Sequence, residues 1–191
     1  MNLTDTLKNI VPFPPEELHD IASHFKKETF GKNQNLVTEG QICTKLYFIE
    51  QGAGRSFYLK EDGKEITQWF FTEGKFMSSI ESFFQQIPSI YYLEMLEDSV
   101  AYSITRENLD RLFEKYPNME RFGRLLSTEM LTRVVNKLNA LQFQTAKERY
   151  EYMLTEFPDI STRVPLGYIA SYLGMTQETL SRIRRNDSKK T

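Results

Sequence analysis

The stretch LGYIASYLGMTQETLSRI, residues 166–183, contains two short amphipathic segments joined by a glycine. Pro165 stands immediately before the first segment, where proline favours the first turn of a helix, and Gly174 predicts a tight turn after it. Thr176 is a residue type that caps helix N-termini, so a second helix is expected over residues 177–185. A helix, a glycine turn and a capped second helix predict a helix-turn-helix, which places its second helix in the major groove of DNA.

The second helix of this motif carries polar side chains of the kinds that read base edges. Four apolar side chains are expected in the core shared by the two helices: Ile169, Leu173, Leu180 and Ile183. The outward face then presents the predicted base-reading residues: Gln177, Glu178, Ser181 and Arg182. Arginine pairs with guanine, glutamine with adenine, and glutamate accepts from cytosine. A second set suits contacts with DNA phosphates: Thr176, Arg184, Arg185, Lys189 and Lys190.

The alternative for this module is a surface helix pair with ordinary charges. That alternative explains the charges, but it does not explain the cap, the turn and the spacing together. The whole chain of 191 residues has a formal net charge of −2, so it does not attract nucleic acid globally. Residues 176–191 contain five basic and two acidic side chains, which provides a local patch.

The totals also indicate a compartment. The single cysteine, Cys43, excludes an internal disulfide and suits a reducing environment. Residues 1–20 lack the basic start and apolar run of a secretory signal. No stretch approaches the ~18 apolar residues of a membrane-spanning helix. We therefore expect a cytoplasmic protein with no membrane partner.

The first part of the chain, up to about Thr105, has the pattern of an antiparallel β-domain. A short helix is expected from Pro15 to Phe25. Runs rich in aromatic and β-branched residues then predict strands at residues 46–49, 56–59, 66–71, 90–96 and 100–104. Glu61-Asp62-Gly63 predicts a hairpin, because Asp-Gly supplies the positive φ angles of such turns. Short strands at a spacing of roughly 8–12 residues favour a sandwich or roll.

Residues 106–141 are predicted to be helical, with Pro117 between a short helix and a longer one. The longer helix has apolar residues at steps of three and four: Met119, Phe122, Leu126, Met130, Val134, Leu138 and Leu141. Three more apolar residues widen this stripe: Leu125, Leu131 and Val135. So broad a stripe needs two partners, the β-domain and the same helix of a second chain, which predicts a homodimer. The alternative is that both faces pack within one chain. A further helix is expected to begin at Thr145 and to end near Phe157.

The motif at residues 166–183 resembles the helix-turn-helix of the Crp/Fnr family of regulators. Residues 178–182, Glu-Thr-Leu-Ser-Arg, are similar to the family's Glu-x-x-Ser-Arg readers, whose Glu and Arg contact bases. The resemblance extends over nearly the whole chain. It includes three turn glycines and one strand: Gly40, Gly52, Gly74 and residues 45–49.

This resemblance implies an α+β fold. It comprises an N-terminal antiparallel β-roll of the double-stranded β-helix or jelly-roll type, a long dimerisation helix and a C-terminal helix-turn-helix domain. The boundaries implied are residues 1–117 for a cyclic-nucleotide-binding-like sensor, 118–141 for the dimerisation helix and 142–191 for the DNA-binding domain. The function implied is a sequence-specific transcription regulator on double-stranded DNA with a palindromic operator, with RNA polymerase as a candidate partner. The family's module usually continues into a β-wing. Residues 186–191 are too short for one, so we expect the basic tail to take over phosphate contacts.

The resemblance also indicates what the sensor binds. In the family's cyclic-nucleotide binders a Gly-Glu-Leu segment holds the ribose, and an arginine ten residues after the Glu neutralises the cyclic phosphate. Ser79 and Ser89 stand at those two positions here, so cyclic AMP is not the expected ligand. Arg55 and Arg133 are the cations that could substitute. The candidate effector pocket comprises Ser78, Ser79, Glu81, Ser82, Ser89 and Arg55, for an unidentified small-molecule effector or none.

No cofactor or metal is predicted. Cys43 alone cannot hold an iron–sulfur cluster, and His19 and His24 in the N-terminal helix do not favour haem ligation. Two other function classes stay as alternatives: a cyclic-nucleotide-binding signalling module with a vestigial DNA-binding half, and an enzyme. For the enzyme there is no metal-ligand spacing, nucleophile–base pair or phosphate cradle. The only paired carboxylates would be Glu81 with Glu94 or Glu97, which scattered surface acids explain better.

Overall fold

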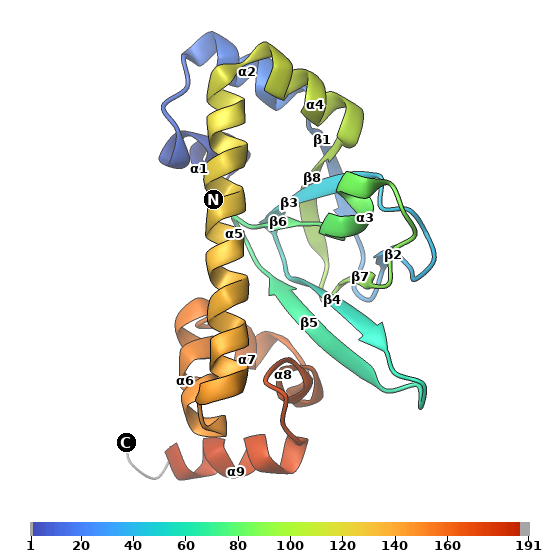
Figure 1. The fold of residues 1–191 in the computed structure, drawn as a ribbon, viewed down its shortest axis with the longest axis vertical. Coiled ribbons are helices and arrows are strands. Elements are labelled where there is room, and N and C mark those ends of the chain that lie inside the picture. The colour runs from blue at the N-terminus through green and yellow to red at the C-terminus, as the bar shows by residue number, and fades with distance from the viewer. Residues whose placement is uncertain (1, 188–191) are drawn as a thin grey trace. The chain divides into compact units, whose positions relative to one another are not determined.

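The computed structural model describes residues 2–187 and contains two compact units (Figure 1). The first unit is Met1–Ser56 with Phe70–Met130, and the second is Phe57–Trp69 with Leu131–Thr191. The chain passes between them inside two strands and inside the longest helix. The predicted α+β class is confirmed, because antiparallel sheets, a long helix and a group of C-terminal helices are all present.

Two sheets of four strands each form the β-domain. The strands are β1 (Lys26–Phe30), β2 (Asn35–Val37), β3 (Lys45–Gln51), β4 (Gly54–Leu59), β5 (Glu65–Phe71), β6 (Phe76–Met77), β7 (Tyr92–Met95) and β8 (Ser99–Thr105). The strand order is β1-β8-β3-β6 in one sheet and β2-β7-β4-β5 in the other. β8 is antiparallel to both of its neighbours, β1 and β3. In this order the first strand of the domain, β1, pairs with the last, β8.

The central position of β3 follows from its composition. Its residues 46–49 are all apolar and all buried, as a strand covered on both faces requires. Leu46 pairs with Ile104 of β8, and Phe48 pairs with Phe76 of β6. β8 instead alternates between buried and half-buried residues over most of its length, the pattern of a strand with one face toward the core.

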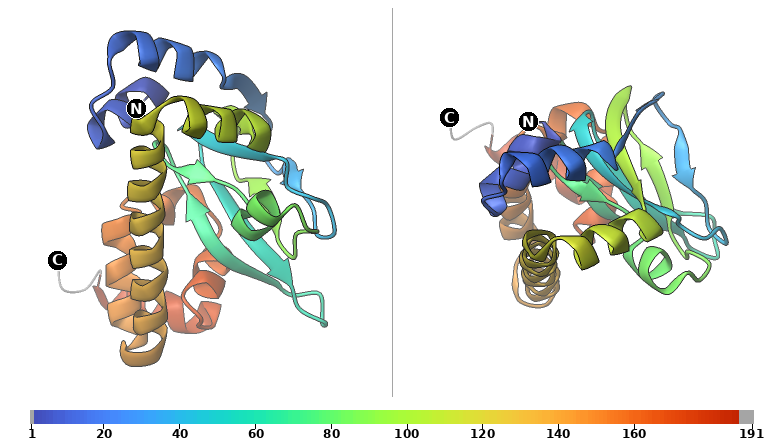
Figure 2. Two further views of the ribbon diagram at one scale, coloured as in Figure 1. Left: turned by 45° about the horizontal axis from the view of Figure 1, so that its top comes forward. Right: turned by 90° about the horizontal axis from the view of Figure 1, so that it is seen from above.

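The first unit also holds four short helices and the beginning of the longest one. These are α1 (Leu3–Ile10), α2 (Pro15–Ser23), α3 (Ile80–Gln85), α4 (Arg106–Lys115) and α5 (Pro117–Phe143), which is continuous in the left view of Figure 2. Gly123 allows α5 to approach α4, because a Cβ there would lie 2.9 Å from the Phe113 ring. Met119 and Phe122 of α5 are buried. Within residues 2–187 no helix is both long enough and apolar enough to cross a bilayer.

As far as residue 187, the second unit contains the far half of α5 and four helices after it. These are α6 (Ala146–Glu156), α7 (Ile160–Arg163), α8 (Leu166–Tyr172) and α9 (Gln177–Asp187). Thr145 caps α6 as predicted, and it does so in a capping box: its hydroxyl accepts the Glu148 N–H at 3.3 Å, and its own N–H donates to the Glu148 carboxylate at 2.7 Å. These donors fix where α6 begins.

Most predicted elements are confirmed, and several further elements were not predicted. The five predicted strands, the helix at Pro15 and the helices after Arg106 are all present. Elements that the sequence analysis missed are short: β1, β2, β6, α1, α3 and α7. β1 reads Lys-Lys-Glu-Thr-Phe with no buried residue, so its pairing with β8, not its composition, makes it a strand.

The hairpin between β4 and β5 forms as predicted, but its turn differs in detail. Gly63 has a φ of 78°, whereas Asp62 is not among the residues with positive φ. The Gly63 N–H donates to the Lys60 carbonyl at 2.8 Å, and the Lys60 N–H donates to the Lys64 carbonyl at 3.0 Å. The loop is therefore longer than a two-residue turn and needs positive φ only at its glycine.

Candidate functional site

Helices α8 and α9 form the predicted helix-turn-helix. Gly174 makes the turn with a φ of 65°, and the Met175 N–H donates to the carbonyl of Ala170 at 3.0 Å. The shared core is confirmed for three of its four residues, which are buried: Ile169, Leu173 and Leu180. Ile183 is half-buried. The small side chain of Ala170 is buried as well, which lets the two helices approach closely.

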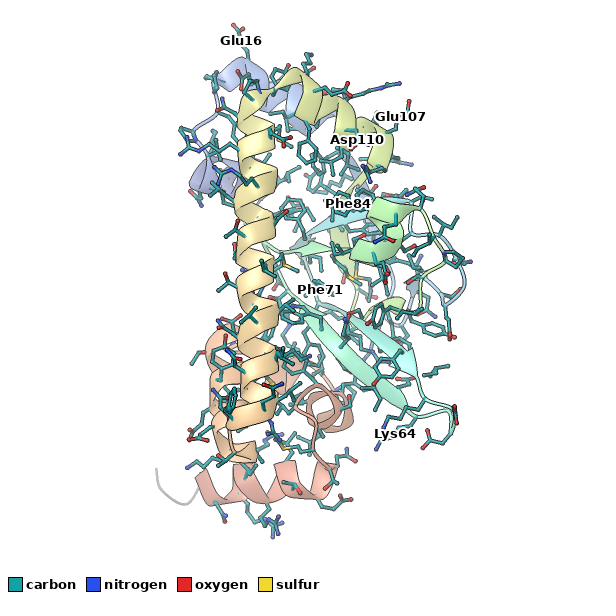
Figure 3. The ribbon with its side chains drawn as sticks, viewed as in Figure 1. Glu16, Lys64, Phe71, Phe84, Glu107 and Asp110 are labelled. Atoms are coloured by element: carbon teal, nitrogen blue, oxygen red, sulfur yellow. The ribbon has the colours of Figure 1, made fainter. Side chains whose placement is uncertain are left out.

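Thr176 caps α9, as the sequence predicted. Its hydroxyl accepts the Thr179 N–H at 3.2 Å. The pKa of Glu178 lies below its ordinary value because its own backbone N–H and the Thr176 side chain bond to the carboxylate, with a smaller contribution from the charge of Lys64. Lys64 lies at the turn between β4 and β5 (Figure 3). The N-terminus of α9 thus holds an ionised carboxylate on an exposed side chain.

The side chains predicted to meet DNA occupy the open face of α9. Gln177, Glu178 and Arg182 are exposed, whereas Ser181 is half-buried. The predicted phosphate contacts Thr176, Arg184 and Arg185 are exposed as well. Lys189 and Lys190 lie outside the described residues. Because Leu180 is fully buried on the other side of the helix, the polar residues share a face that the module itself does not cover.

A residue that the sequence analysis missed holds this module to α6. Nε of Arg149 donates to the Leu173 carbonyl at 2.9 Å, and Nη1 donates to the Gln144 carbonyl at 2.9 Å. One guanidinium therefore satisfies the carbonyl at the end of α8 and another just before α6. No sequence signal identifies this role, because both acceptors are backbone atoms that any residue would provide.

In the first unit the structure brings together Ser79 and Ser89, the two serines that the resemblance predicts at the nucleotide-binding positions. The hydroxyl oxygens of Ser79 and Ser89 are 2.8 Å apart, and the residues are 4% and 3% exposed. Ser89 also donates to the Tyr91 carbonyl at 2.8 Å and accepts the Tyr91 N–H at 3.0 Å. The hydrogen-bonding capacity of this pair is thus largely used within the chain.

The other pocket candidates separate into buried and exposed residues. Ser82 accepts the Cys43 N–H at 2.8 Å and donates to the Ile87 carbonyl at 2.6 Å. Ser78 donates to the Lys45 carbonyl at 3.1 Å. Glu81 is exposed on α3, so it does not share the interior position of the serines.

Arg55 is committed to an ion pair. It is 1% exposed, and its Nε and Nη2 each lie 2.7 Å from Oε2 of Glu94 on β7. The sequence analysis treated Glu94 as a scattered surface acid, and that interpretation is wrong because this carboxylate is buried against Arg55. Arg133, the other cation considered for a phosphate, belongs to the second unit and pairs there with Glu156 at 2.9 Å.

The chain is similar to known regulators over most of its length. A family model described as the cyclic nucleotide-binding domain matches residues 27–116. The anaerobic regulatory protein of Aggregatibacter actinomycetemcomitans is 30% identical over 172 residues, which cover 83% of this chain and 65% of that protein. The fumarate and nitrate reduction regulatory protein of Escherichia coli is also 30% identical over 172 residues, covering 83% of this chain and 67% of that protein. The chain therefore spans about two thirds of the length of these relatives.

Solved structures support the fold. FixK2 from Bradyrhizobium japonicum has a TM-score of 0.76 at 20% identity, covering 87% of this chain and 85% of that one. The c-di-GMP responsive global regulator CLP of Xanthomonas campestris has a TM-score of 0.69 at 17% identity, with 93% of both chains covered. At these identities the likeness extends to the fold alone.

Proposed function

The chain belongs to the Crp/Fnr family, and from this premise we propose that it is a sequence-specific DNA-binding transcription regulator. The observation that carries the proposal is the open polar face of α9, capped at Thr176 and backed by the buried Leu180. A helix with this arrangement can enter the major groove with its N-terminal residues against the bases. The relatives named as regulators are consistent with this role.

We assign the DNA contacts by side-chain chemistry. The fork of Arg182 matches the two major-groove acceptors of guanine, and the ionised Glu178 suits the amino group of cytosine. Gln177 and Ser181 complete the base-reading set. Thr176, Arg184 and Arg185 suit phosphate oxygens, which carry no sequence information. Lys189 and Lys190 keep the same proposed role.

We propose a homodimer through α5. The residues of its apolar stripe differ along its length: Met119 and Phe122 are buried in the first unit, whereas Leu131 is 64% and Leu138 is 52% exposed. Three further exposed side chains continue the uncovered part: Val134, Val135 and Leu141. A second α5 would cover them and place two α9 helices about one turn of DNA apart, which favours a palindromic operator.

Static light scattering tests the dimer. At micromolar concentration the mass should be twice that of the 22.5 kDa chain. Replacing Leu131 and Leu138 with glutamate should shift the mass toward the monomer, because the charges would face each other across the interface. A monomeric wild-type protein, with or without DNA, would contradict the dimer.

We extend the proposal to the domain boundaries, the cellular location and the effector. We propose the division into sensor (residues 1–117), dimerisation helix (118–141) and DNA-binding domain (142–191), in a cytoplasmic protein. Cyclic AMP should not be its effector, because Ser79 and Ser89 bond to each other and Arg55 is paired with Glu94. An effector of another kind and RNA polymerase stay as proposed partners.

Selection of bound sequences from random duplex DNA, with and without cyclic AMP, tests the function. A palindromic sequence should be enriched equally in both conditions. Failure to enrich any sequence would contradict a regulator. If cyclic AMP bound tightly in the same experiment, the alternative of a cyclic-nucleotide signalling module would gain support from the matching family model.

A further inference from the structure

The second unit contains a cluster of aromatic and cationic side chains around Trp69, which we call the Trp69 cluster: Trp69, Arg133, Lys137 and Tyr172. Trp69 ends the segment of β5 that belongs to the second unit, and its side chain is buried. The guanidinium of Arg133 lies 5.5 Å and the amino group of Lys137 lies 5.2 Å from its ring centroid. The ring of Tyr172 meets it edge to face at 6.2 Å. Trp69 is therefore in contact with both α5 and α8.

Lys137 of α5 contacts both β5 and α8. Its amino group lies 3.9 Å from the centroid of the Tyr172 ring on α8 and donates a hydrogen bond to the Gln68 carbonyl on β5. A separate hydrogen bond joins the strand and the helix directly, from the Thr67 N–H to the Ser171 hydroxyl at 3.1 Å. One side chain of α5 thus touches the hairpin strand and the first helix of the helix-turn-helix.

The Lys137 side chain is half-buried, and its amino group is partly removed from water. Burial lowers the pKa of the Lys137 amino group to about 7, so folding penalises its charged form. The two ring faces and the carbonyl compensate part of that penalty. A methionine of similar length would fill the same space without the penalty. A methionine would, however, lack the directional contacts that the amino group makes with the strand and the helix.

We propose that Lys137 is a positioning residue for DNA recognition, which holds α8 against the hairpin and the long helix so that α9 is presented in one orientation. The proposal rests on the proposed DNA-binding function. α8 shares the core residues Ile169 and Leu180 with α9, so a fixed α8 fixes the reading helix. Base reading depends on that orientation, whereas phosphate contacts carry no sequence information.

The test uses three full-length variants on operator and scrambled duplexes. Lys137→Met removes the amino group at nearly constant length, and Lys137→Arg keeps a cation that can stack on the rings. Lys147→Met is the matched control, because it removes the same charge from an exposed side chain of α6 in the same unit. The chain contains a single tryptophan, so tryptophan fluorescence reports the environment of the Trp69 cluster alone.

Lys137→Met should lower operator affinity about tenfold, within the range by which residues outside a binding site change coupling. Its binding to scrambled DNA and its unfolding midpoint should stay at or above the wild-type values, and its tryptophan emission should shift. Lys137→Arg should restore operator binding, and Lys147→Met should match the wild type.

Three results would overturn the proposal. These are wild-type operator affinity in Lys137→Met, an equal loss on both duplexes, or a loss that follows a lowered unfolding midpoint. If instead the wild-type protein does not distinguish operator from scrambled DNA, the proposed function fails. The tryptophan emission of Lys137→Met would then still show whether the packing of the Trp69 cluster depends on the Lys137 amino group.

Discussion

Two buried polar pairs of the first unit and the polar face of α9 use the same kinds of side chain in opposite ways. In the first unit Arg55 is paired with Glu94, and Ser79 with Ser89, and all four residues are buried. On α9 a glutamate, an arginine and a serine also lie close together, but Glu178 and Arg182 are exposed. Burial requires partners within the chain, whereas exposure leaves the same groups available to an external ligand.

This difference separates stability from binding. Removing a buried, paired group destabilises the fold, because its partner is left buried without a hydrogen bond. An exposed group contributes little to folding but can decide what the protein recognises. Substitutions of buried and of exposed polar residues should therefore have opposite effects on stability and on DNA binding.

The largest effect is expected for the two arginines. Arg55→Ala leaves the Glu94 carboxylate buried without its partner, which should lower the free energy of unfolding by about 3–5 kcal/mol. Arg182→Ala should change it by no more than about 0.5 kcal/mol, because the side chain is exposed. Urea titrations of both variants measure the difference.

The pairing itself can be tested by removing both partners. The double variant Arg55→Met with Glu94→Leu should recover most of the stability lost in Arg55→Ala, since it leaves no buried charge. If Arg55→Ala were no less stable than Arg182→Ala, the buried pair of Arg55 and Glu94 would not contribute more to stability than the exposed Arg182.

The next effect concerns what the exposed arginine reads. Arg182→Ala should relax the preference for one base pair in each half-site, with a loss of discrimination of ~1–3 kcal/mol. Arg185→Ala should instead weaken binding to all sequences alike and lower the salt slope by about one, because a phosphate contact is indifferent to sequence. Gel-shift titrations on operator and scrambled DNA compare the two. Equal losses on both duplexes for both variants would rule out base reading by Arg182.

The smallest effect is expected for the serines. Ser79→Ala removes a buried hydrogen bond to Ser89 and should lower the free energy of unfolding by about 1 kcal/mol. Ser181→Ala should leave stability within about 0.5 kcal/mol but weaken operator binding, because Ser181 lies in the base-reading set. Thermal unfolding and gel shifts on the same preparations measure both quantities. A stable Ser79→Ala variant that binds cyclic AMP would show that the cluster is an open pocket.

The helix-turn-helix was the part of the site most completely predicted from sequence. The cap at Thr176, the turn at Gly174 and the buried Leu180 are all confirmed. The effector cluster was predicted only in part. Ser79 and Ser89, predicted in one candidate pocket, lie within hydrogen-bond distance of each other, but Glu81 is exposed and the partner of Arg55 was not identified.

Features that depend on neighbours three or four residues apart could be predicted from the local sequence. Thr145 caps a helix through Glu148, Thr176 does so through Thr179, and the apolar period of α5 follows from a helical repeat of 3.6 residues. Such contacts form wherever the local chain is helical, so residue types at fixed spacing are enough to predict them.

Contacts between side chains far apart in the sequence follow instead from the folded arrangement of strands and helices. Arg55 and Glu94 are 39 residues apart and pair because β4 and β7 are neighbours in one sheet. Lys137 meets Gln68 across 69 residues because a strand, the long helix and α8 converge. Strand order and helix packing result from burying the whole apolar surface at once, and no short pattern of residues contains that information.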